Sequence, residues 1–340
     1  MKNIIFLTHA EKNPSGGAKV IYRFSEIIND INGFSSEVIH IKKKKISKLR
    51  DSLKKRFNYS IKNITGWQFN EITPVKNFKY KWFKNKVKIK DNFHIDKEKD
   101  FVILPEIFAH LADQFLVRNN IQYGIFVQNG YILDSTNDNK KLNSSYKNAK
   151  FILSISNDTT NCIKLKFPKI RNRIVQVSYS INMGKINYKN KKNIITYMSR
   201  KLPMHSKLVT SFLRTYLPKN WKLKDLNNLS EQKTYKIMKK SKIFLSFSSL
   251  EGLGLPPIEA ALAGNQIIGY TGEGGKEYWH KPIFTKINSG EINEFVFKIL
   301  ELVRNEKIKK NSLKKNYTDI KKKFSKTNEL KNIKKFLNLI

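Results

Sequence analysis

The chain has 340 residues, of which 40% are hydrophobic, and 66 Lys and Arg against 27 Asp and Glu give it a formal charge of +39. This much apolar material excludes wholesale disorder, and the length fits two domains. Cys162 is the single cysteine, which excludes an internal disulfide and predicts a reducing, cytoplasmic compartment. No segment approaches the roughly 18 apolar residues of a membrane span, so we expect a soluble chain or one peripheral on the inner face of a membrane.

The basic residues are mostly lysine, since only nine of them are arginine. Arginine has the bidentate fork that recognises phosphate and guanine, so a dedicated nucleic-acid reader would be expected to contain more of it. The charge therefore makes nucleic-acid binding an alternative function and not the leading one.

Predicted strands and helices alternate over the first 180 residues. In chain order they are a strand at 4–7, turn residues at 13–17, a helix over 20–31, strands at 38–41 and 101–104, a helix through Leu111 and Leu116, and strands at 123–128, 151–156 and 174–177. A segment at about 42–100 interrupts the pattern with 19 Lys and Arg against six Asp and Glu, among scattered aromatic residues. We therefore predict a Rossmann-like N-terminal domain over 1–185 with a basic insertion at about 42–100.

A second α/β series follows. Its predicted elements are a strand at 193–198, a helix at 205–216, a strand at 221–226, a helix at 231–240, a strand at 243–247, a helix from about 256, a strand at 266–270, and a long C-terminal helix pair with a Lys-rich outer face. We predict a second Rossmann-like domain over 186–315 and a Lys-rich helix over 316–340 that packs back on the first domain. The fold class is thus α/β, with two doubly wound domains facing across a cleft.

The most informative segment runs from Phe244 to Gly264. A buried strand ends in a glycine turn, and the turn opens directly into a helix with Pro256 and Pro257 in its first turn. A helix start presents unpaired N–H groups and the positive end of the dipole, and glycines let a phosphate approach the backbone. The segment therefore predicts an anion site built from backbone.

Two carboxylates flank this site, Glu251 at the end of the strand and Glu259 within the helix. We expect Glu259 to point outward from the helix, and Glu251 to lie at the mouth of the cleft. Carboxylates accept hydrogen bonds from hydroxyls, so the pair suits a ligand with a diphosphate and sugar hydroxyls. For either glutamate alone, the helix dipole is an equally good explanation.

The block from Glu251 to Glu259, the following Ala263-Gly264 and the downstream glycine turn at 271–277 resemble the retaining GT-B glycosyltransferases with a Glu-x7-Glu signature, which are family 4-like. The strand end Tyr197-Met198-Ser199-Arg200-Lys201 makes the chain most similar to short bacterial members. The resemblance is strong over about 190–305 and weaker over 1–180. It implies a metal-independent hexosyltransferase that moves a sugar, with retention, from a nucleotide-diphosphate sugar to a glycan or lipid-linked acceptor in cell-surface polysaccharide synthesis.

The resemblance also implies a role for each residue of the motif. Glu259 would hold the nucleotide ribose, and Glu251 would contact the donor sugar. Amides around Gly252, Gly254 and Leu255 would line the sugar and phosphate side of the donor.

Arg200 and Lys201 would neutralise the diphosphate leaving group. This assignment fits their chemistry independently, because a preorganised Arg/Lys pair stabilises developing charge without a metal. Lys207 competes with Lys201 for the lysine role, and either of them could also be a solvated surface lysine. No motif for a metal ion or another cofactor accompanies them.

In the first domain, Gly16 and Gly17 match the glycine loop of the family, although two glycines after a strand are more often a plain turn. Better-known members carry a histidine where this chain has Glu106. Two readings of Glu106 stay open, a contact to donor or acceptor sugar and a strand-end carboxylate without a role. Gln128 and Asn129 are similar candidates for recognising hydroxyls.

Two further alternatives remain. The chain could be a basic protein that binds nucleic acid or an anionic surface with an inactive glycosyltransferase-like fold, or the basic insertion could hold an active enzyme at an anionic membrane. Residues 241–290 contain four Lys and four Glu, so the proposed site is charge-balanced and the charge of +39 lies mostly outside it.

Overall fold

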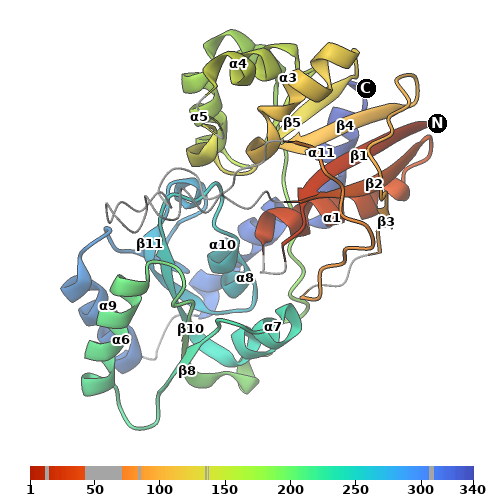
Figure 1. Ribbon diagram of the computed structural model, residues 1–340. Coiled ribbons are helices and arrows are strands. Elements are labelled where there is room, and N and C mark those ends of the chain that lie inside the picture. The colour runs from red at the N-terminus through yellow and green to blue at the C-terminus, as the bar shows by residue number, and fades with distance from the viewer. Residues whose placement is uncertain (12–14, 43–70, 83–85, 135, 137, 306–309) are drawn as a thin grey trace. The chain divides into compact units, whose positions relative to one another are not determined.

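The computed structural model describes residues 1–340 except 12–14, 43–70, 83–85, 135, 137 and 306–309, and most of the predicted basic insertion lies outside the described residues. The chain divides into two units (Figure 1). Unit 1 consists of Met1–Val177 and Leu330–Ile340, and unit 2 of Ser178–Glu329.

Unit 1 contains a seven-stranded parallel sheet in the order β3-β2-β1-β4-β5-β6-β7. Its strands are β1 (Lys2–His9), β2 (Phe34–Ile41), β3 (Lys88–Ile89), β4 (Asp100–Pro105), β5 (Tyr123–Val127), β6 (Ile152–Ser154) and β7 (Ile174–Gln176). The central strands β1 and β4 are apolar runs that are buried along most of their length, as expected for parallel strands covered on both faces.

The helices of unit 1 are α1 (Gly16–Asn29), α3 (Leu111–Phe115), α4 (Asn139–Asn148) and α5 (Asn157–Lys166), with 3-10 turns η2 (Glu106–Phe108), η3 (Val117–Asn119), η4 (Gly130–Ile132) and η5 (Pro168–Arg173). Helix α1 begins after Ser15, whose side chain accepts a hydrogen bond from the amide of Ala18, and it buries Phe24 and Ile28. Helices α4 and α5 were not predicted, because their few buried residues leave most of each sequence polar.

Unit 2 contains a five-stranded parallel sheet in the order β12-β11-β10-β8-β9. Its elements are β8 (Lys192–Tyr197), β9 (Lys222–Asp225), β10 (Ser241–Ser248), β11 (Gln266–Thr271), β12 (Phe284–Lys286), α6 (Pro203–Tyr216), α7 (Glu231–Lys240), α8 (Leu255–Leu262), α9 (Ile292–Arg304) and α10 (Lys310–Lys323), with 3-10 turns η6 (Tyr188–Asn190) and η7 (Gly274–Glu277). Helices α6 and α9 lie side by side (Figure 1) and bury Val209, Leu213, Phe295 and Ile299 in the core of the unit.

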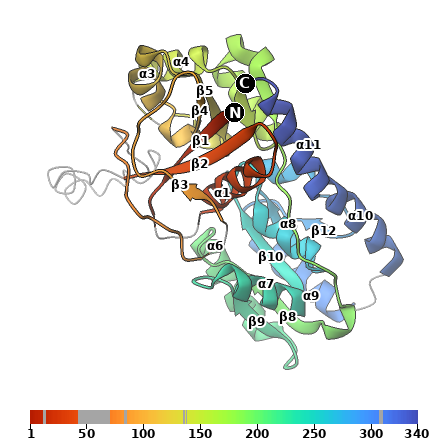
Figure 2. The same cartoon turned by 90° about the vertical axis from the view of Figure 1, so that its right-hand side faces the viewer.

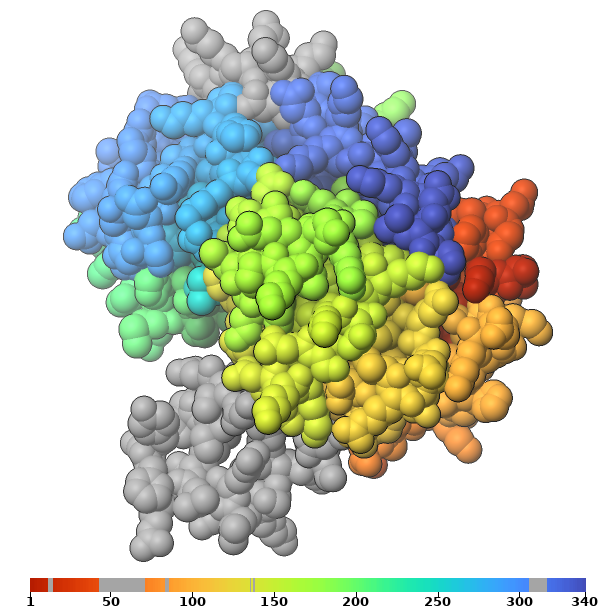
Figure 3. Space-filling model, turned by 90° about the horizontal axis from the view of Figure 1, so that it is seen from above, coloured from red at the N-terminus to blue at the C-terminus, as the bar shows by residue number. Residues whose placement is uncertain are grey.

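The last helix, α11 (Lys326–Leu337), brings the chain back to unit 1. The Phe336 ring stacks on Phe24 at 6.4 Å between centroids and lies 5.8 Å from Phe151. The C-terminus accordingly lies near the N-terminal strand (Figures 2 and 3). The predicted C-terminal helix pair is in fact three helices, α9, α10 and α11. Helix α10 ends at Lys323, and Ser325, just before α11, accepts a hydrogen bond from the amide of Asn328 in α11.

Candidate functional site

In both sheets the order of strands reverses next to the first strand of the unit. The reversal lies between β1 and β4 in unit 1 and between β8 and β10 in unit 2. Open α/β sheets bind ligands outside the carboxyl ends of their strands at such a reversal. Most of the site residues predicted from the sequence directly follow these four strands, so the topology places them at the two edges where ligands bind.

Lys201 and Glu251 meet at the carboxyl edge of unit 2. Strands β8 and β10 pair in parallel, with Ile195 opposite Ile243, so the loops that follow them emerge next to each other. The Lys201 ammonium donates a hydrogen bond to Oε1 of Glu251, and the two side chains are 32% and 19% exposed. The ion pair is therefore accessible to a ligand.

The loop that carries Glu251 is held by the downstream glycine turn. The amide of Gly274 donates to the Glu251 carbonyl at 3.1 Å, and a Cβ on Gly274 would lie 1.9 Å from the Gly252 carbonyl oxygen. Gly272 has a φ of +60°, and a Cβ there would also meet backbone. Only glycine allows the two loops to pack this closely.

Helix α8 begins at Leu255, after Gly254, whose φ of +74° lies in the left-handed region that favours glycine. Pro256 and Pro257 carry no N–H, so the first turn of α8 presents fewer donors than most helix starts, and Leu255 has one of those that remain. The hydroxyl of the buried Tyr278 donates to the Gly254 carbonyl at 2.8 Å and supports this turn. Tyr278 was missed in the sequence, where it is one more aromatic residue after the glycine turn.

Glu259 is only 8% exposed, and its carboxylate contacts helix α7. The Tyr235 hydroxyl of α7 donates to Glu259 Oε1 at 2.7 Å. Burial and the nearby Glu259 raise the pKa of Tyr235 well above its usual range, so the hydroxyl stays a donor. The expected outward orientation of Glu259 is in fact a buried one, because α7 packs beside α8, and the sequence held no sign of this neighbour.

The remaining predicted side chains of unit 2 lie near β8 and α6. Of the two rival lysines, Lys201 is the one paired with Glu251, whereas Lys207 is exposed on α6, and Arg200 is exposed in the turn after β8. His205 was not identified as a site residue from the sequence; its Nδ1 lies 2.9 Å from the Tyr270 hydroxyl at the end of β11.

In unit 1, Gly17 brings the first turn of α1 against the end of β5. A Cβ on Gly17 would lie 2.3 Å from Oε1 of Gln128, so this position is closed to larger residues unless Gln128 moves. Within the described part of the chain, Nε2 of Gln128 is buried and has no hydrogen-bond partner. Gly16 is exposed at the start of the helix.

Glu106 is 3% exposed and lies against the backbone of the loop after β5. Its Oε2 accepts a hydrogen bond from the Gln128 amide at 3.1 Å, and its Oε1 accepts one from the Asn129 amide at 2.9 Å. Burial raises the pKa of Glu106 to about 7, although the amide donors act in the opposite direction. Both oxygens are thus occupied by backbone, which favours a supporting role over direct contact with a sugar.

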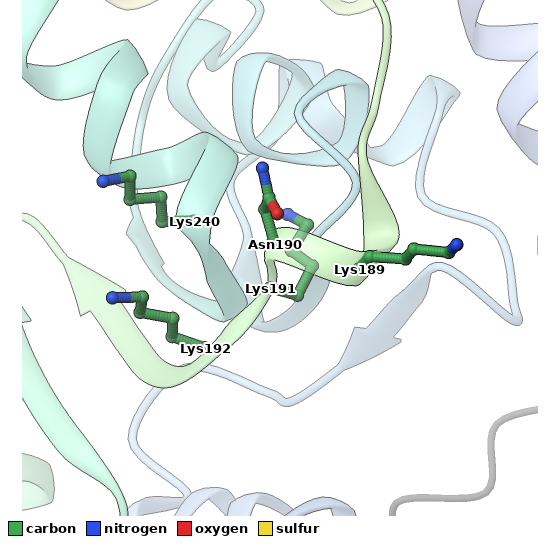
Figure 4. Close-up of a pocket in the computed structure, with 5 residues that line it drawn as sticks. All are labelled: Lys189, Asn190, Lys191, Lys192 and Lys240. Atoms are coloured by element: carbon green, nitrogen blue, oxygen red, sulfur yellow. The ribbon is translucent and has the colours of Figure 1, made fainter.

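A cavity of about 390 Å³ in unit 2 is lined by Lys189, Asn190, Lys191, Lys192 and Lys240 (Figure 4). It lies at the amino end of β8, opposite the edge that carries Lys201. Lys191 donates to the carbonyls of Met238, Ser241 and Ala263. These carbonyls lie at the ends of α7 and α8, so Lys191 acts as a helix C-cap. In Figure 4, Lys189 extends away from Lys192 and Lys240, so the lysines do not converge on one ligand position.

No protein-family model and no curated protein matches the sequence. The structure, however, is similar over nearly its whole length to solved glycosyltransferase structures. TarM of S. aureus has 13% identity and a TM-score of 0.65, with 100% of this chain and 98% of TarM covered. HepE of Anabaena, solved with UDP and glucose, has 10% identity and a TM-score of 0.65, with 100% of both chains covered.

The lipopolysaccharide outer core galactosyltransferase WaaB has 15% identity and a TM-score of 0.62, and the likeness covers 99% of this chain and 98% of WaaB. Identities this low show a common fold and not a common activity. The two parallel α/β units predicted from the sequence are confirmed, and the chain has the GT-B fold of these glycosyltransferases.

Proposed function

We propose that the protein is a retaining glycosyltransferase that moves a sugar from a nucleoside-diphosphate sugar to a glycan or glycolipid acceptor. The observation that carries the proposal is the edge of unit 2 at the strand reversal. There, Lys201 pairs with Glu251, the glycine turn at 271–277 packs on the loop that carries Glu251, and that loop leads into the start of α8. The UDP present in the HepE and TarM structures makes uridine diphosphate sugars the first donors to test.

Each group has a proposed role in binding the donor. The amides of Gly254 and Leu255 and the positive end of α8 would receive phosphate oxygens. Glu259, oriented by Tyr235, would accept hydrogen bonds from the ribose hydroxyls. Glu251 would contact the sugar, and Lys201 would exchange its ion pair with Glu251 for the negatively charged diphosphate.

The proposed reaction is a front-face displacement. The bond between the anomeric carbon and the diphosphate oxygen breaks, and the acceptor oxygen bonds to the same face of that carbon. The departing diphosphate takes the acceptor proton, so no separate general base is needed. Arg200 and Lys201 would stabilise the charge that develops on the leaving group. No metal or other cofactor is proposed.

Thermal unfolding with a panel of nucleoside diphosphates and their sugars tests the proposal. A ligand that binds the native state raises the melting temperature, and the rise grows with the ratio of ligand concentration to Kd. We expect one donor to stabilise the wild type and to be slowly hydrolysed. Glu259→Gln should weaken the binding of that donor by about tenfold, because one hydrogen bond to a charged group is lost.

Glu301→Gln is the matched control, because Glu301 is an exposed carboxylate on α9 of the same unit and pairs with Lys298. It should bind donor as the wild type does. The proposal fails if no nucleotide sugar stabilises the chain, or if Glu259→Gln and Glu301→Gln bind donor equally well.

A further inference from the structure

Helix α6 exposes a line of large apolar side chains along one side. They are Met204, Leu208, Phe212 and Tyr216, which are 73%, 40%, 43% and 64% exposed. Residues four apart lie on the same side of a helix, so these side chains form a continuous stripe. The other side of α6 faces the core of unit 2, where Val209 and Leu213 are fully buried.

Four large apolar groups in a row are unusual on a surface that stays in water. Elsewhere in the described chain, exposed large apolar residues include Leu165 on α5, which is 83% exposed and has no such row around it. An isolated residue of that kind needs no explanation. The stripe on α6 therefore indicates a surface that binds a partner when the protein functions.

The charge around the stripe is positive. Residues 200–224 include seven Lys and Arg and no Asp or Glu. Within α6, Lys207 and Arg214 are exposed, and Lys219 is exposed just beyond its last turn, three residues after Tyr216. The neighbouring α9 exposes a single large apolar residue, Phe297, and carries the exposed Glu294 and Glu301, so the continuous apolar and basic surface lies on α6.

A surface that is both apolar and basic matches the boundary of an anionic lipid bilayer. Apolar side chains enter the region between headgroups and acyl chains, and lysine and arginine pair with the headgroups. Aromatic residues such as Phe212 and Tyr216 are suited to this depth. A nucleic acid would satisfy the basic side chains but leave the apolar stripe in water. A second copy would bring two basic faces together in a chain of charge +39.

We propose that the α6 face, defined as Met204, Leu208, Phe212 and Tyr216 with Lys207 and Arg214, docks on an anionic lipid surface. The contact is peripheral: none of the helices among the described residues is long and apolar enough to cross a bilayer. This inference does not depend on the proposed transfer reaction, because lipid binding is measured without donor or acceptor.

Vesicle flotation of the full chain tests the proposal. Vesicles of phosphatidylcholine alone are compared with vesicles that also contain phosphatidylglycerol, at about 0.1 M and about 1 M salt, where the Debye length falls from about 10 Å to about 3 Å. High salt screens the general attraction of so basic a chain and leaves the apolar part of the binding. We expect Leu208→Ser combined with Phe212→Ser to lower binding at high salt by about tenfold.

Leu165→Ser is the matched control, an exposed leucine outside the stripe, and it should bind as the wild type does. The double variant and Leu165→Ser both change exposed positions, so neither should lower the melting temperature. Arg214→Gln with Lys219→Gln provides a second arm and should lower binding to anionic vesicles at low salt only.

Several results would overturn the proposal: no binding to anionic vesicles, equal binding to neutral and anionic vesicles at low salt, or an equal loss of binding in the Leu165→Ser control. Sedimentation that shows a dimer of the wild type and a monomer of the double variant would assign the stripe to a second copy instead. Donor-induced stabilisation of the same variants shows whether the nucleotide site is intact, which separates failure of this proposal from failure of the proposed reaction.

Discussion

At the scale of single residues, the candidate site contains pairs of side chains whose contact was not predicted. Glu251 and Glu259 stand out in the sequence because they flank a glycine turn. Tyr235, which donates to Glu259, lies 24 positions away on another helix, so its relation to the carboxylate appears only in the fold. Lys201 was predicted as a phosphate ligand, and its ion pair with Glu251 was not anticipated.

Glu106 gives a prediction about pH. Its folded-state pKa is about 7, against an ordinary value of 4.5. The folded state therefore binds this proton more tightly than the unfolded state, and the associated stability is present below pH 4.5 and lost as the pH rises through 7. Glu106→Gln cannot titrate. Relative to this variant, the free energy of unfolding of the wild type should fall by about 3 kcal/mol at most over that interval.

Urea unfolding of both proteins at a series of pH values measures the difference. Glu98→Gln, at an exposed carboxylate of the same unit, serves as the control and should follow the wild type. If the free energy of unfolding changes with pH in the same way in the wild type and in Glu106→Gln, Glu106 is not a buried titrating group.

At the scale of elements, the site is made by two loops that interlock through glycine. The glycine turn before α8 was predicted from its residues, and the turn at 271–277 from the resemblance to the glycosyltransferases. Their contact follows from the parallel pairing of β10 with β11, which brings the ends of the two strands to the same edge. Tyr278 then fixes the start of α8 through the Gly254 carbonyl.

Gly274→Ala should disrupt this contact. The new methyl group would lie 1.9 Å from the Gly252 carbonyl oxygen, and the atoms it meets belong to the backbone of Glu251 and Gly252, which cannot move aside as a flexible side chain could. We expect a loss of about 1–3 kcal/mol in the free energy of unfolding, together with weaker nucleotide binding. Thermal unfolding with and without nucleotide measures both quantities.

Gly275→Ala is the neighbouring control, because its methyl group would meet the Tyr278 hydroxyl at 3.3 Å and no backbone at comparable distance. Its stability should stay within about 1 kcal/mol of the wild type. Equal effects at the two positions would mean that the close approach of the loops is not what requires glycine.

At the scale of the whole molecule, the chain joins its two units twice, once at Val177 and again within α11. The second crossing returns the C-terminal residues to the unit with which the chain began. The Phe336 side chain is fully buried there between Phe24 of α1 and Phe151, the residue before β6. The C-terminal segment is therefore part of the core of unit 1.

Phe336→Ala should remove this anchor. Truncation of a fully buried phenylalanine costs about 3–5 kcal/mol, so unit 1 should unfold at lower denaturant concentration. Leu339→Ala, three residues on and at a side chain that is 44% exposed, should change stability by less than about 0.5 kcal/mol. Proteolysis of both variants reports which unit opens, and preferential cleavage of unit 2 in Phe336→Ala would contradict the assignment.

The sequence by itself determined the two α/β series, the glycine turns and the motif of Glu251 to Glu259, because apolar periodicity and turn residues are local signals. It missed β3, which is only two residues long, and β12, in which Phe284 is the one apolar residue of three.

Only the tertiary structure decided which residues meet. The strand reversals place Lys201 beside Glu251 and bring Gly17 to the end of β5, and packing of α7 on α8 buries Glu259 against Tyr235. Such contacts join segments that are tens of residues apart, and no local pattern encodes them. The net charge of +39 also follows from the sequence, but only the fold shows that some of the basic residues lie on the same helix, α6, as an exposed apolar stripe.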